Sequence, residues 1–226
     1  MNESDEQIIV VGGGKGGVGK TTISMAVVDT LLKHDKEVIL IESDKENSDA
    51  FFALENVIPC VVCDLSQIEG WALLGNTLEN NPTKWIVINT AAGATGHLVE
   101  FGHLLADAAK ELGIDMVMLW PINRQRDCLE LLRKFFEGDS ASAYQATYVV
   151  KNTYFGEAKK FARFDNSKIK DRTTGTISMP ELYDMLTDKI VDNRWAFGST
   201  TGLSIVERSI LNKFRNDVDQ AFKVLL

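Results

Sequence analysis

No run of apolar residues in this 226-residue chain approaches the roughly 20 that are needed to cross a bilayer. The first seven residues, MNESDEQ, are acidic and lack the basic-then-apolar pattern of a secretion signal. We therefore expect a cytoplasmic protein without a membrane partner. The chain also lacks an excess of positive charge, because its formal net charge is −8. This balance argues against a protein that coats DNA by bulk electrostatics, although it is compatible with a local basic patch.

Cysteine pairs are scarce as well. Cys60 and Cys63 form a C-x-x-C, a spacing that is also found in iron–sulfur carriers, but the surrounding residues are typical of a strand. Positions three apart on a strand project to opposite faces, so the two thiols are poorly placed to share a metal or a disulfide. There is no second pair, Cys128 stands alone, and the three histidines show no ligand spacing. We interpret the cysteines as buried structural residues, with a cluster shared across a dimer interface left open.

What the chain does contain is an alternation of short apolar runs and amphipathic stretches. The expected strands span residues 7–13, 37–43, 59–64, 84–90, 115–121, 145–152 and 174–180, and the clearest helical patterns span 21–34, 97–112 and 126–138. Several of the apolar runs are continuous, as in parallel strands that are covered on both faces. Such alternation predicts right-handed βαβ units and an open parallel sheet. We expect one α/β domain over residues 1–226.

The stretch from residue 12 to 22, GGGKGGVGKTT, lies between the first expected strand and the first expected helix. It contains the G-x-x-x-x-G-K-[ST] pattern of a phosphate-binding loop, in which backbone N–H groups converge on phosphate oxygens. Lys20 would place its charge near the β- and γ-phosphates, the Thr21 hydroxyl would bind Mg²⁺, and Thr22 would donate to an α-phosphate oxygen. The residues of this loop that are predicted to bind ATP and Mg²⁺ are Gly14, Lys15, Gly16, Gly17, Val18, Gly19, Lys20, Thr21 and Thr22.

A second lysine in this loop makes the pattern more specific. The string K-G-G-V-G-K-T-T, which begins at Lys15, resembles the deviant Walker A motif of the ParA/MinD superfamily. The resemblance is specific in the loop and extends more loosely over the whole chain. It implies a P-loop NTPase fold, with a mostly parallel central sheet and helices on both faces. It also implies that Lys15 reaches the phosphates bound by a partner subunit, so that an ATP-dependent homodimer forms and both Lys15 and Lys20 act in catalysis.

Other family positions match less closely. Where the family has Asp-x-Asp at the end of its second strand, this chain has Glu42 and Asp44, and the resemblance assigns Asp44 to the attacking water and the Mg²⁺ site. The string ESDKENSD looks most like the TraL/StbB-type branch carried by plasmids, which would place Asn47 and Asp49 in switch I. An acidic loop that simply ends a strand is the equally supported alternative for these two residues.

The expected Walker B strand ends in Asn89, where the family usually has Asp. An asparagine contributes less to the field of a Mg²⁺ ion, so nucleotide binding should survive this change better than turnover does. Asn152 and Pro180 match positions that contact the nucleotide base in the family. Each also has a plain structural explanation, since Asn152 ends a strand and Pro180 could open a helix over residues 181–189.

One segment departs from the acidic trend. From Lys151 to Arg172, seven basic and three acidic residues give a net charge of +4, and aromatic residues are interleaved with the lysines. This composition would suit DNA binding through phosphate contacts and stacking. The alternative is a surface whose lysines cover packed aromatic rings. Near the C-terminus, apolar residues at helical spacing (Ile210, Phe214, Val218 and Phe222) predict a helix that packs on the core rather than one that lies on a membrane.

Taken with the resemblance, these features predict a slowly hydrolysing ATP-dependent switch. The expected role is plasmid partition, stability or conjugative transfer, and an activating partner protein is implied. Two alternatives stay open. One is an iron–sulfur carrier, and the other is a nucleotide-gated binding module with little catalysis.

Overall fold

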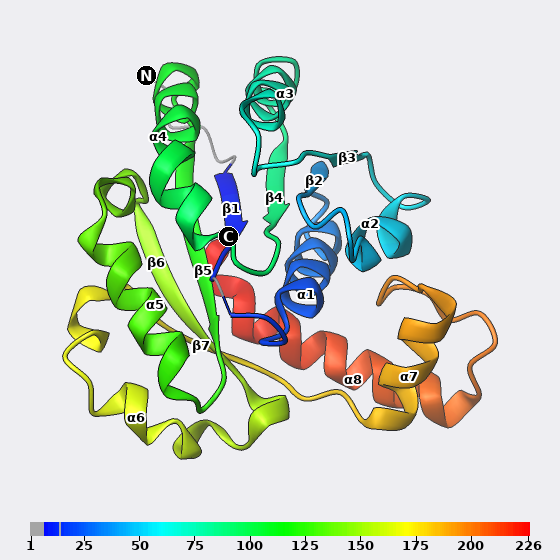
Figure 1. Ribbon diagram of the computed structural model, residues 1–226. Coiled ribbons are helices and arrows are strands. Elements are labelled where there is room, and N and C mark those ends of the chain that lie inside the picture. The colour runs from blue at the N-terminus through cyan, green and yellow to red at the C-terminus, as the bar shows by residue number, and fades with distance from the viewer. Residues whose placement is uncertain (1–6, 14) are drawn as a thin grey trace.

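A seven-stranded sheet forms the centre of the protein (Figure 1). The computed structural model describes residues 7–13 and 15–226. The strand order is β3-β2-β4-β1-β5-β6-β7, and all neighbouring strands pair in parallel. The strands are β1 (Gln7–Val11), β2 (Val38–Glu42), β3 (Cys60–Val62), β4 (Trp85–Asn89), β5 (Asp115–Ile122), β6 (Ala146–Asn152) and β7 (Gly175–Met179). The parallel sheet expected from the sequence is thus confirmed.

Helices connect the successive strands, and two more helices follow the last strand. They are α1 (Lys20–Lys33), α2 (Asp49–Leu54), α3 (Ile68–Glu79), α4 (Thr95–Leu112), α5 (Arg126–Glu137), α6 (Ala162–Asp165), α7 (Asp184–Asn193) and α8 (Ile205–Phe222). Short 3-10 turns are η1 (Asp139–Ala143), η2 (Thr153–Phe155), η3 (Ala158–Lys160), η4 (Lys170–Arg172) and η5 (Lys223–Leu225).

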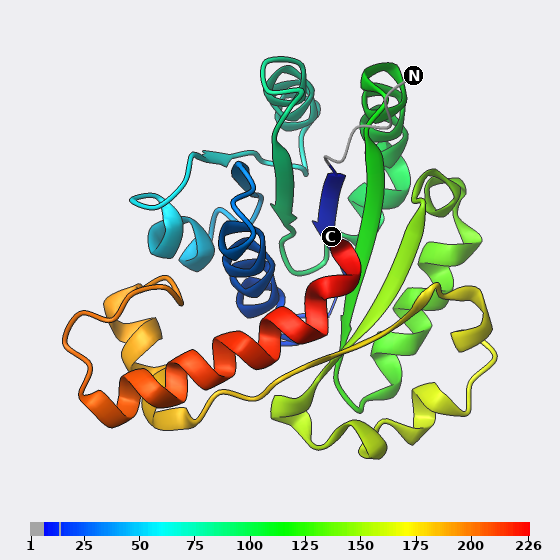
Figure 2. The same cartoon turned by 180° about the vertical axis from the view of Figure 1, so that it is seen from behind.

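Helices lie on both faces of the sheet, as opposite views of the ribbon show (Figures 1 and 2). The buried residues form two apolar layers, one on each face. Residues from α1, α2, α7 and α8 form one layer with Ile9 and Val11 of β1. Residues from α3, α4 and α5 form the other layer with Ile8 and Val10. Because successive strand residues point to opposite faces, a strand with both faces covered must be apolar throughout. This explains the continuous apolar runs in the sequence.

The two cysteines of the C-x-x-C lie in different layers. Cys60 is half-buried against the layer that contains α1 (the α1 layer), whereas Cys63 is fully buried in the layer that contains α4 (the α4 layer). Burial raises the pKa of the Cys60 thiol to about 12 and that of Cys63 to about 11, so both are protonated at neutral pH. Among the described residues, no group of three or more His, Cys, Asp or Glu side chains is placed to hold a metal ion. The expectation that Cys60 and Cys63 face apart is therefore confirmed.

Helix α8 is a core-packing helix, as predicted. Phe214, Val218 and Phe222 are buried in the α1 layer, and Ser204 with Glu207 forms a capping box at the start of the helix. Within the described residues, no helix combines the length and the apolar character that a membrane span needs.

A buried ion pair joins α8 to α1. Arg215 Nε donates to both carboxylate oxygens of Asp29 at 3.1 and 2.9 Å, and Nη2 adds a third hydrogen bond at 2.8 Å. The Asp29 side chain is only 8% exposed and that of Arg215 only 21%. A pair in this bidentate geometry is stable while intact, but removal of one partner leaves the other charge without compensation.

We therefore expect Asp29→Ala to lower the free energy of unfolding by about 3 kcal/mol, measured by urea denaturation. The control is Asp217→Ala, which breaks an exposed i,i+4 pair with Lys213 on the same helix and should cost less than about 0.5 kcal/mol. Equal losses in the two variants would contradict a structural role for the Asp29–Arg215 pair.

Candidate functional site

The glycine-rich loop lies where the carboxyl ends of three strands meet. β1 ends at Val11, which is in register with Asn89 at the end of β4, and Asn89 is in register with Glu42 at the end of β2. The Gly12 N–H donates to the carbonyl of Leu119 in β5 at 2.9 Å. This hydrogen bond fixes the first residue of the loop to the neighbouring strand. In open parallel sheets, ligands bind at this edge. Gly14, a predicted phosphate contact, lies outside the described residues.

The two lysines of the loop have different surroundings. Lys20, the first residue of α1, is 8% exposed, and its Nζ donates to the carbonyl of Lys15 at 3.1 Å. Burial lowers the Lys20 pKa, while the nearby charge of Asp44 opposes that shift. Lys15 is more exposed, and its Nζ lies 2.6 Å from Asp127 Oδ2 at the start of α5. The Asp127 hydrogen bond raises the Lys15 pKa. Nothing in the sequence pattern singled out Asp127.

Asn152 holds the loop from the side. Its Nδ2 donates to the carbonyl of Val18 at 3.0 Å, and its Oδ1 accepts from the Tyr154 N–H at 3.1 Å. Gly19 lies beneath this amide with φ +93°, and a Cβ at that position would come within 2.3 Å of Asn152 Nδ2. The position therefore requires glycine both for its backbone conformation and for the close approach of Asn152.

Asn152 and Pro180 both line one cavity beside the loop. The cavity has a volume of about 260 Å³ and also includes Gly17, Gly19 and Thr22. The two residues predicted to contact the base therefore lie beside the loop, and their contact with a base stays a prediction. Pro180 does not open a helix, because α7 begins at Asp184 and residues 180–183 form an extended connection from β7. The predicted helix over residues 181–189 was therefore too early by three residues.

The segment after β2 forms a turn around Asp44. Asp44 Oδ1 accepts from the Asn47 N–H at 3.0 Å, and its carbonyl accepts from Ser48 Oγ at 2.8 Å. Asp44 and His97 line a cavity of about 420 Å³ on this side of the loop. Asp49 begins α2, where an acidic side chain favours the helix N-terminus, so the structural explanation suffices for that residue.

A buried network joins the ends of β2 and β4. Asn89 Nδ2 donates to both oxygens of the Glu42 carboxylate at 3.0 Å, and Asn89 Oδ1 accepts from Ser24 Oγ of α1 at 3.1 Å. The Asp44 N–H also donates to Glu42 Oε1 at 2.9 Å. Glu42 is fully buried, and burial raises its pKa to about 7. Sequence reasoning treated Glu42 only as a weakened match and did not identify Ser24.

This site has the chemistry to bind a magnesium nucleotide. The N-terminus of the 14-residue helix α1 meets the loop, and the first N–H groups of a helix have no partner within the helix and can donate to phosphate oxygens. Lys20 adds positive charge. The side chains that could serve Mg²⁺ are the Thr21 hydroxyl and the Asp44 carboxylate, both oxygen ligands of the type this ion prefers. A nucleotide would complete the coordination with its own phosphates.

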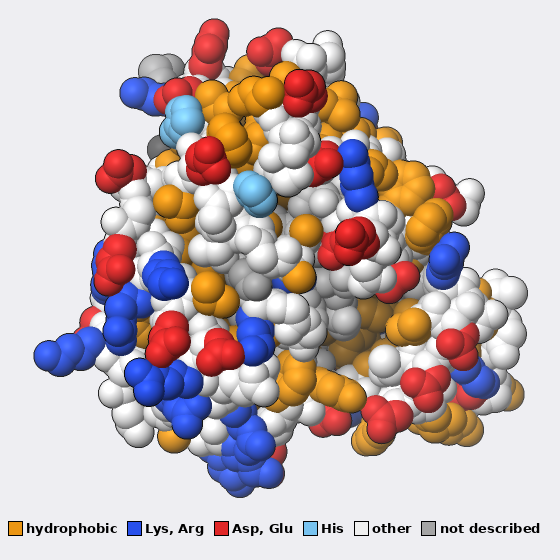
Figure 3. Space-filling model, viewed as in Figure 1, with side chains coloured by type: hydrophobic (Ala, Val, Ile, Leu, Met, Phe, Trp, Pro, Cys, Tyr) orange, Lys and Arg blue, Asp and Glu red, His pale blue; other side chains and the backbone are white. Residues whose placement is uncertain are grey.

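The basic segment 151–172 differs from the expectation for DNA binding. Lys151 is buried, pairs with Asp165 at 2.6 Å and lies over the rings of Phe161 and Phe164. Both rings are 1% exposed, so neither they nor Lys151 can contact a nucleic acid. Stacking by these aromatic residues is therefore wrong, and packing explains them. Lysine and arginine side chains still gather over α5 and α6, at the lower left of Figure 3, and DNA contact through the exposed ones stays a prediction.

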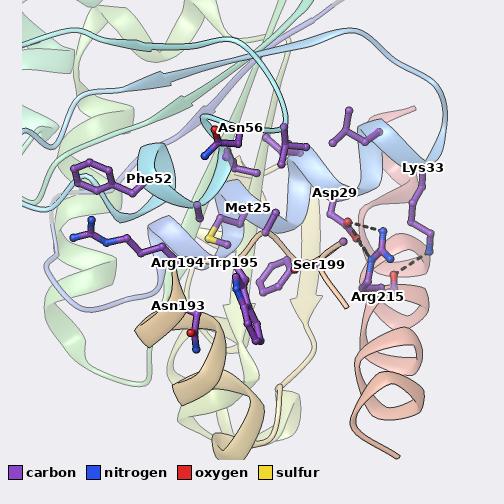
Figure 4. A pocket seen from close by; sticks show the side chains of 18 residues that line it. Met25, Asp29, Lys33, Phe52, Asn56, Asn193, Arg194, Trp195, Ser199 and Arg215 are labelled. Carbon is purple, nitrogen blue, oxygen red and sulfur yellow. Dashed lines mark hydrogen bonds and ion pairs between the residues drawn. The ribbon is translucent and has the colours of Figure 1, made fainter. Parts of the chain in front are cut away.

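A further cavity lies elsewhere and was not predicted. It has a volume of about 680 Å³ between α1, α2 and residues 193–199, and its lining contains none of the described residues of the glycine-rich loop (Figure 4). The Arg194 guanidinium lies 4.1 Å from the centre of the Phe52 ring, and the two side chains line one end of this cavity (Figure 4). Trp195 and Met25 line it, and the Asp29–Arg215 pair borders it.

Comparisons with known proteins agree with this geometry. The model of the CobQ/CobB/MinD/ParA nucleotide-binding domain matches residues 9–223. The chain is 34% identical over 223 residues to Protein MobD of Acidithiobacillus ferrooxidans, covering 96% of this chain and 97% of that protein.

Solved structures share the fold at lower identity. MinD in the MinC:MinD complex of Aquifex aeolicus is 18% identical, with a TM-score of 0.58 and coverage of 97% of this chain and 95% of that one. A protein described as a plasmid partition protein from Borrelia burgdorferi, bound to AMPPNP, is 18% identical, with a TM-score of 0.56 and coverage of 98% and 100%.

The contact between Gly19 and Asn152 can be tested directly. We expect Gly19→Ala to lower the free energy of unfolding by about 2 kcal/mol, because the new Cβ meets the Asn152 amide and φ is positive. Gly75→Ala is the control, since it lies within α3 with no atom near the added Cβ and should stabilise by about 0.5–1 kcal/mol. Thermal or urea unfolding measures both. A neutral Gly19→Ala would mean that the loop adapts freely.

Proposed function

This chain belongs to the CobQ/CobB/MinD/ParA nucleotide-binding family, and we propose that it is an ATP-dependent molecular switch that dimerises when ATP is bound. The observation that carries the proposal is the different placement of the two loop lysines. Lys20 is buried and folded over its own loop, whereas Lys15 is more exposed and its ammonium group pairs with the exposed carboxylate of Asp127. An exposed ion pair of this kind contributes little stability, so Lys15 can exchange Asp127 for another anion at small cost.

Each residue near the loop then has a distinct role. Bound Mg·ATP supplies the γ-phosphate, whose release or retention sets the state of the switch. Lys20 and the loop N–H groups hold the phosphates of the same chain, and Thr21 with Asp44 serves the metal. Asp44 also orients the attacking water. Lys15 leaves Asp127 and binds the phosphates of the second subunit, so the dimer depends on the nucleotide.

Slow turnover fits the neutral side chain at the end of β4. Asn89 cannot supply a negative charge, and its Oδ1 already accepts from Ser24. We propose weak hydrolysis that a partner protein stimulates. The second candidate is a nucleotide-gated binding module with negligible hydrolysis, which Asn89 equally favours. Stimulated turnover would distinguish the two. No observation favours an iron–sulfur carrier, since Cys60 and Cys63 belong to different apolar layers.

A role in plasmid maintenance or transfer is the proposed context. The 34% identity to MobD over nearly the whole chain and the likeness to a plasmid partition protein support it. The partner protein and any DNA contact belong to the same proposal.

The two lysines should fail in different ways. Lys20→Ala removes charge from the phosphate cradle of its own chain and should abolish measurable ATP binding. Lys15→Ala leaves that cradle intact, so ATP should bind nearly normally. The variant should not dimerise, because each charged contact to a phosphate is worth roughly 1.5–3 kcal/mol and a symmetric dimer has two.

Nucleotide affinity and molecular mass by light scattering, with ADP, ATP and a non-hydrolysable analogue, measure both effects on one sample. Lys134→Ala, an exposed lysine of α5, is the matched control and should behave as wild type. If Lys15→Ala forms an ATP-dependent dimer as stable as that of wild type, Lys15 does not serve the nucleotide of the second subunit.

The role of Asp44 needs a substitution that preserves its turn. Asp44→Asn retains an oxygen that can accept from the Asn47 N–H but removes the charge. We expect ATP binding to persist, turnover to fall by about 100-fold, and the ATP dimer to live longer. Glu46→Gln, an exposed carboxylate two residues away, is the control. Steady-state hydrolysis and dimer lifetime are the measurements, and normal turnover in Asp44→Asn would rule the role out.

A further inference from the structure

Glu42 is a fully buried carboxyl group with no cationic partner among the described residues. Its relative exposure is 0%, and among the described residues no Lys, Arg or His lies within ion-pair distance of it. It accepts hydrogen bonds from the Asn89 amide and the Asp44 N–H, and the backbone of Phe51 is a further neutral donor close to it. Burial of a carboxylate is costly when only neutral groups surround it. A bound cation nearby would remove most of that cost.

Asn89 fits Glu42 because it is not an acid. Its Nδ2 reaches both Glu42 oxygens, while its Oδ1 is fixed by Ser24. An aspartate at residue 89 would instead put two carboxylates face to face in a buried site, which is unfavourable unless a proton or a metal lies between them. The pair therefore keeps one carboxylate and one carboxamide at adjacent strand ends, and the carboxylate is on β2.

The Glu42 carboxylate lies between the chain segment that follows β2 and the chain segment that follows β4. Ser43, the next residue, donates its N–H to the Asn89 carbonyl at 3.0 Å, and its Oγ accepts from the Ala91 N–H at 3.1 Å. The Asp44 N–H contacts Glu42 itself. The chain after β2 and the chain after β4 are thus tied together around the Glu42–Asn89 pair, next to the helix that carries Lys20 and Thr21.

We propose that Glu42 supplies the negative charge that the magnesium–nucleotide site lacks at Asn89, and that Asn89 is a positioning residue for the Glu42 carboxylate. The inference rests on the proposed nucleotide function, and it adds a second acidic group, Glu42 at the end of β2, to the Asp44 carboxylate already assigned to the site. The negative charge would then lie at Glu42, not at residue 89, where the resemblance predicts an aspartate.

The test compares the wild type with Glu42→Gln, Asn89→Asp and the double swap Glu42→Gln/Asn89→Asp. The readout is the affinity for a fluorescent ATP analogue in EDTA and during a Mg²⁺ titration, so hydrolysis is not needed. In EDTA, Glu42→Gln should bind the analogue with an affinity within about twofold of wild type. In the titration, it should need about tenfold more Mg²⁺ to reach half of the Mg²⁺-dependent gain in affinity. The swap restores one acid beside one amide, and should return the Mg²⁺ requirement to within about threefold of wild type.

Asn89→Asp gives an independent readout through stability. Two buried carboxylates should lower its thermal midpoint without Mg²⁺, and Mg²⁺ with the ATP analogue should raise that midpoint more than it does for wild type. Glu37→Gln is the control, because Glu37 is an exposed carboxylate just before the opposite end of the same strand and should leave every value unchanged.

The outcomes separate this inference from the proposed function. A wild type that binds no nucleotide in either buffer overturns both. A wild type that binds, with a Mg²⁺ requirement unchanged in Glu42→Gln, overturns the assignment to Glu42 alone. If Glu42→Gln does not fold, the swap decides, since it keeps the composition of the buried pair. A folded swap that binds in EDTA but has lost its response to Mg²⁺ also overturns the assignment.

Discussion

The register between β1, β4 and β2 is the constraint on which the rest of the site depends. Parallel pairing aligns Val11, Asn89 and Glu42 across three strands, so the glycine-rich loop and the segments after β2 and β4 all emerge at one edge. A slip of one residue would exchange the side chains of a strand between the two apolar layers and would take Val11, Asn89 and Glu42 out of alignment. The core thus specifies the geometry of the site as well as the stability of the fold.

Hydrogen bonds from side chains at the strand ends then hold the loop and the segments around it in position. Asn152 of β6 holds the loop from one side, and the Glu42–Asn89 pair lies on the other. Both use short amide side chains at strand ends, where a rigid backbone limits their movement. The lysine that would serve a second subunit is held differently, because Lys15 pairs with an exposed carboxylate on the first turn of α5. Strongly held groups define the cradle, and a weakly held group can respond to a partner.

Long-range packing gives some residues a role that local patterns do not reveal. Gly70 at the start of α3 is one, because an added Cβ would come within 2.0 Å of the Asp64 carbonyl oxygen. Lys151, Phe161 and Phe164 looked like a nucleic-acid surface, but they form a buried cluster with Asp165. Composition alone cannot distinguish a basic surface from lysine stems that cover a core.

The amino-acid sequence by itself determined the parallel α/β fold, the position of the loop and the opposite orientation of Cys60 and Cys63. These follow from local periodicity, from glycine spacing and from the alternation of side chains along a strand. Only the tertiary structure decided that Asp127 holds Lys15, that Ser24 and Glu42 hold Asn89, and that a large cavity lies beside α2. Such contacts join residues far apart in the chain, and no local pattern encodes which distant side chain will complete a hydrogen bond.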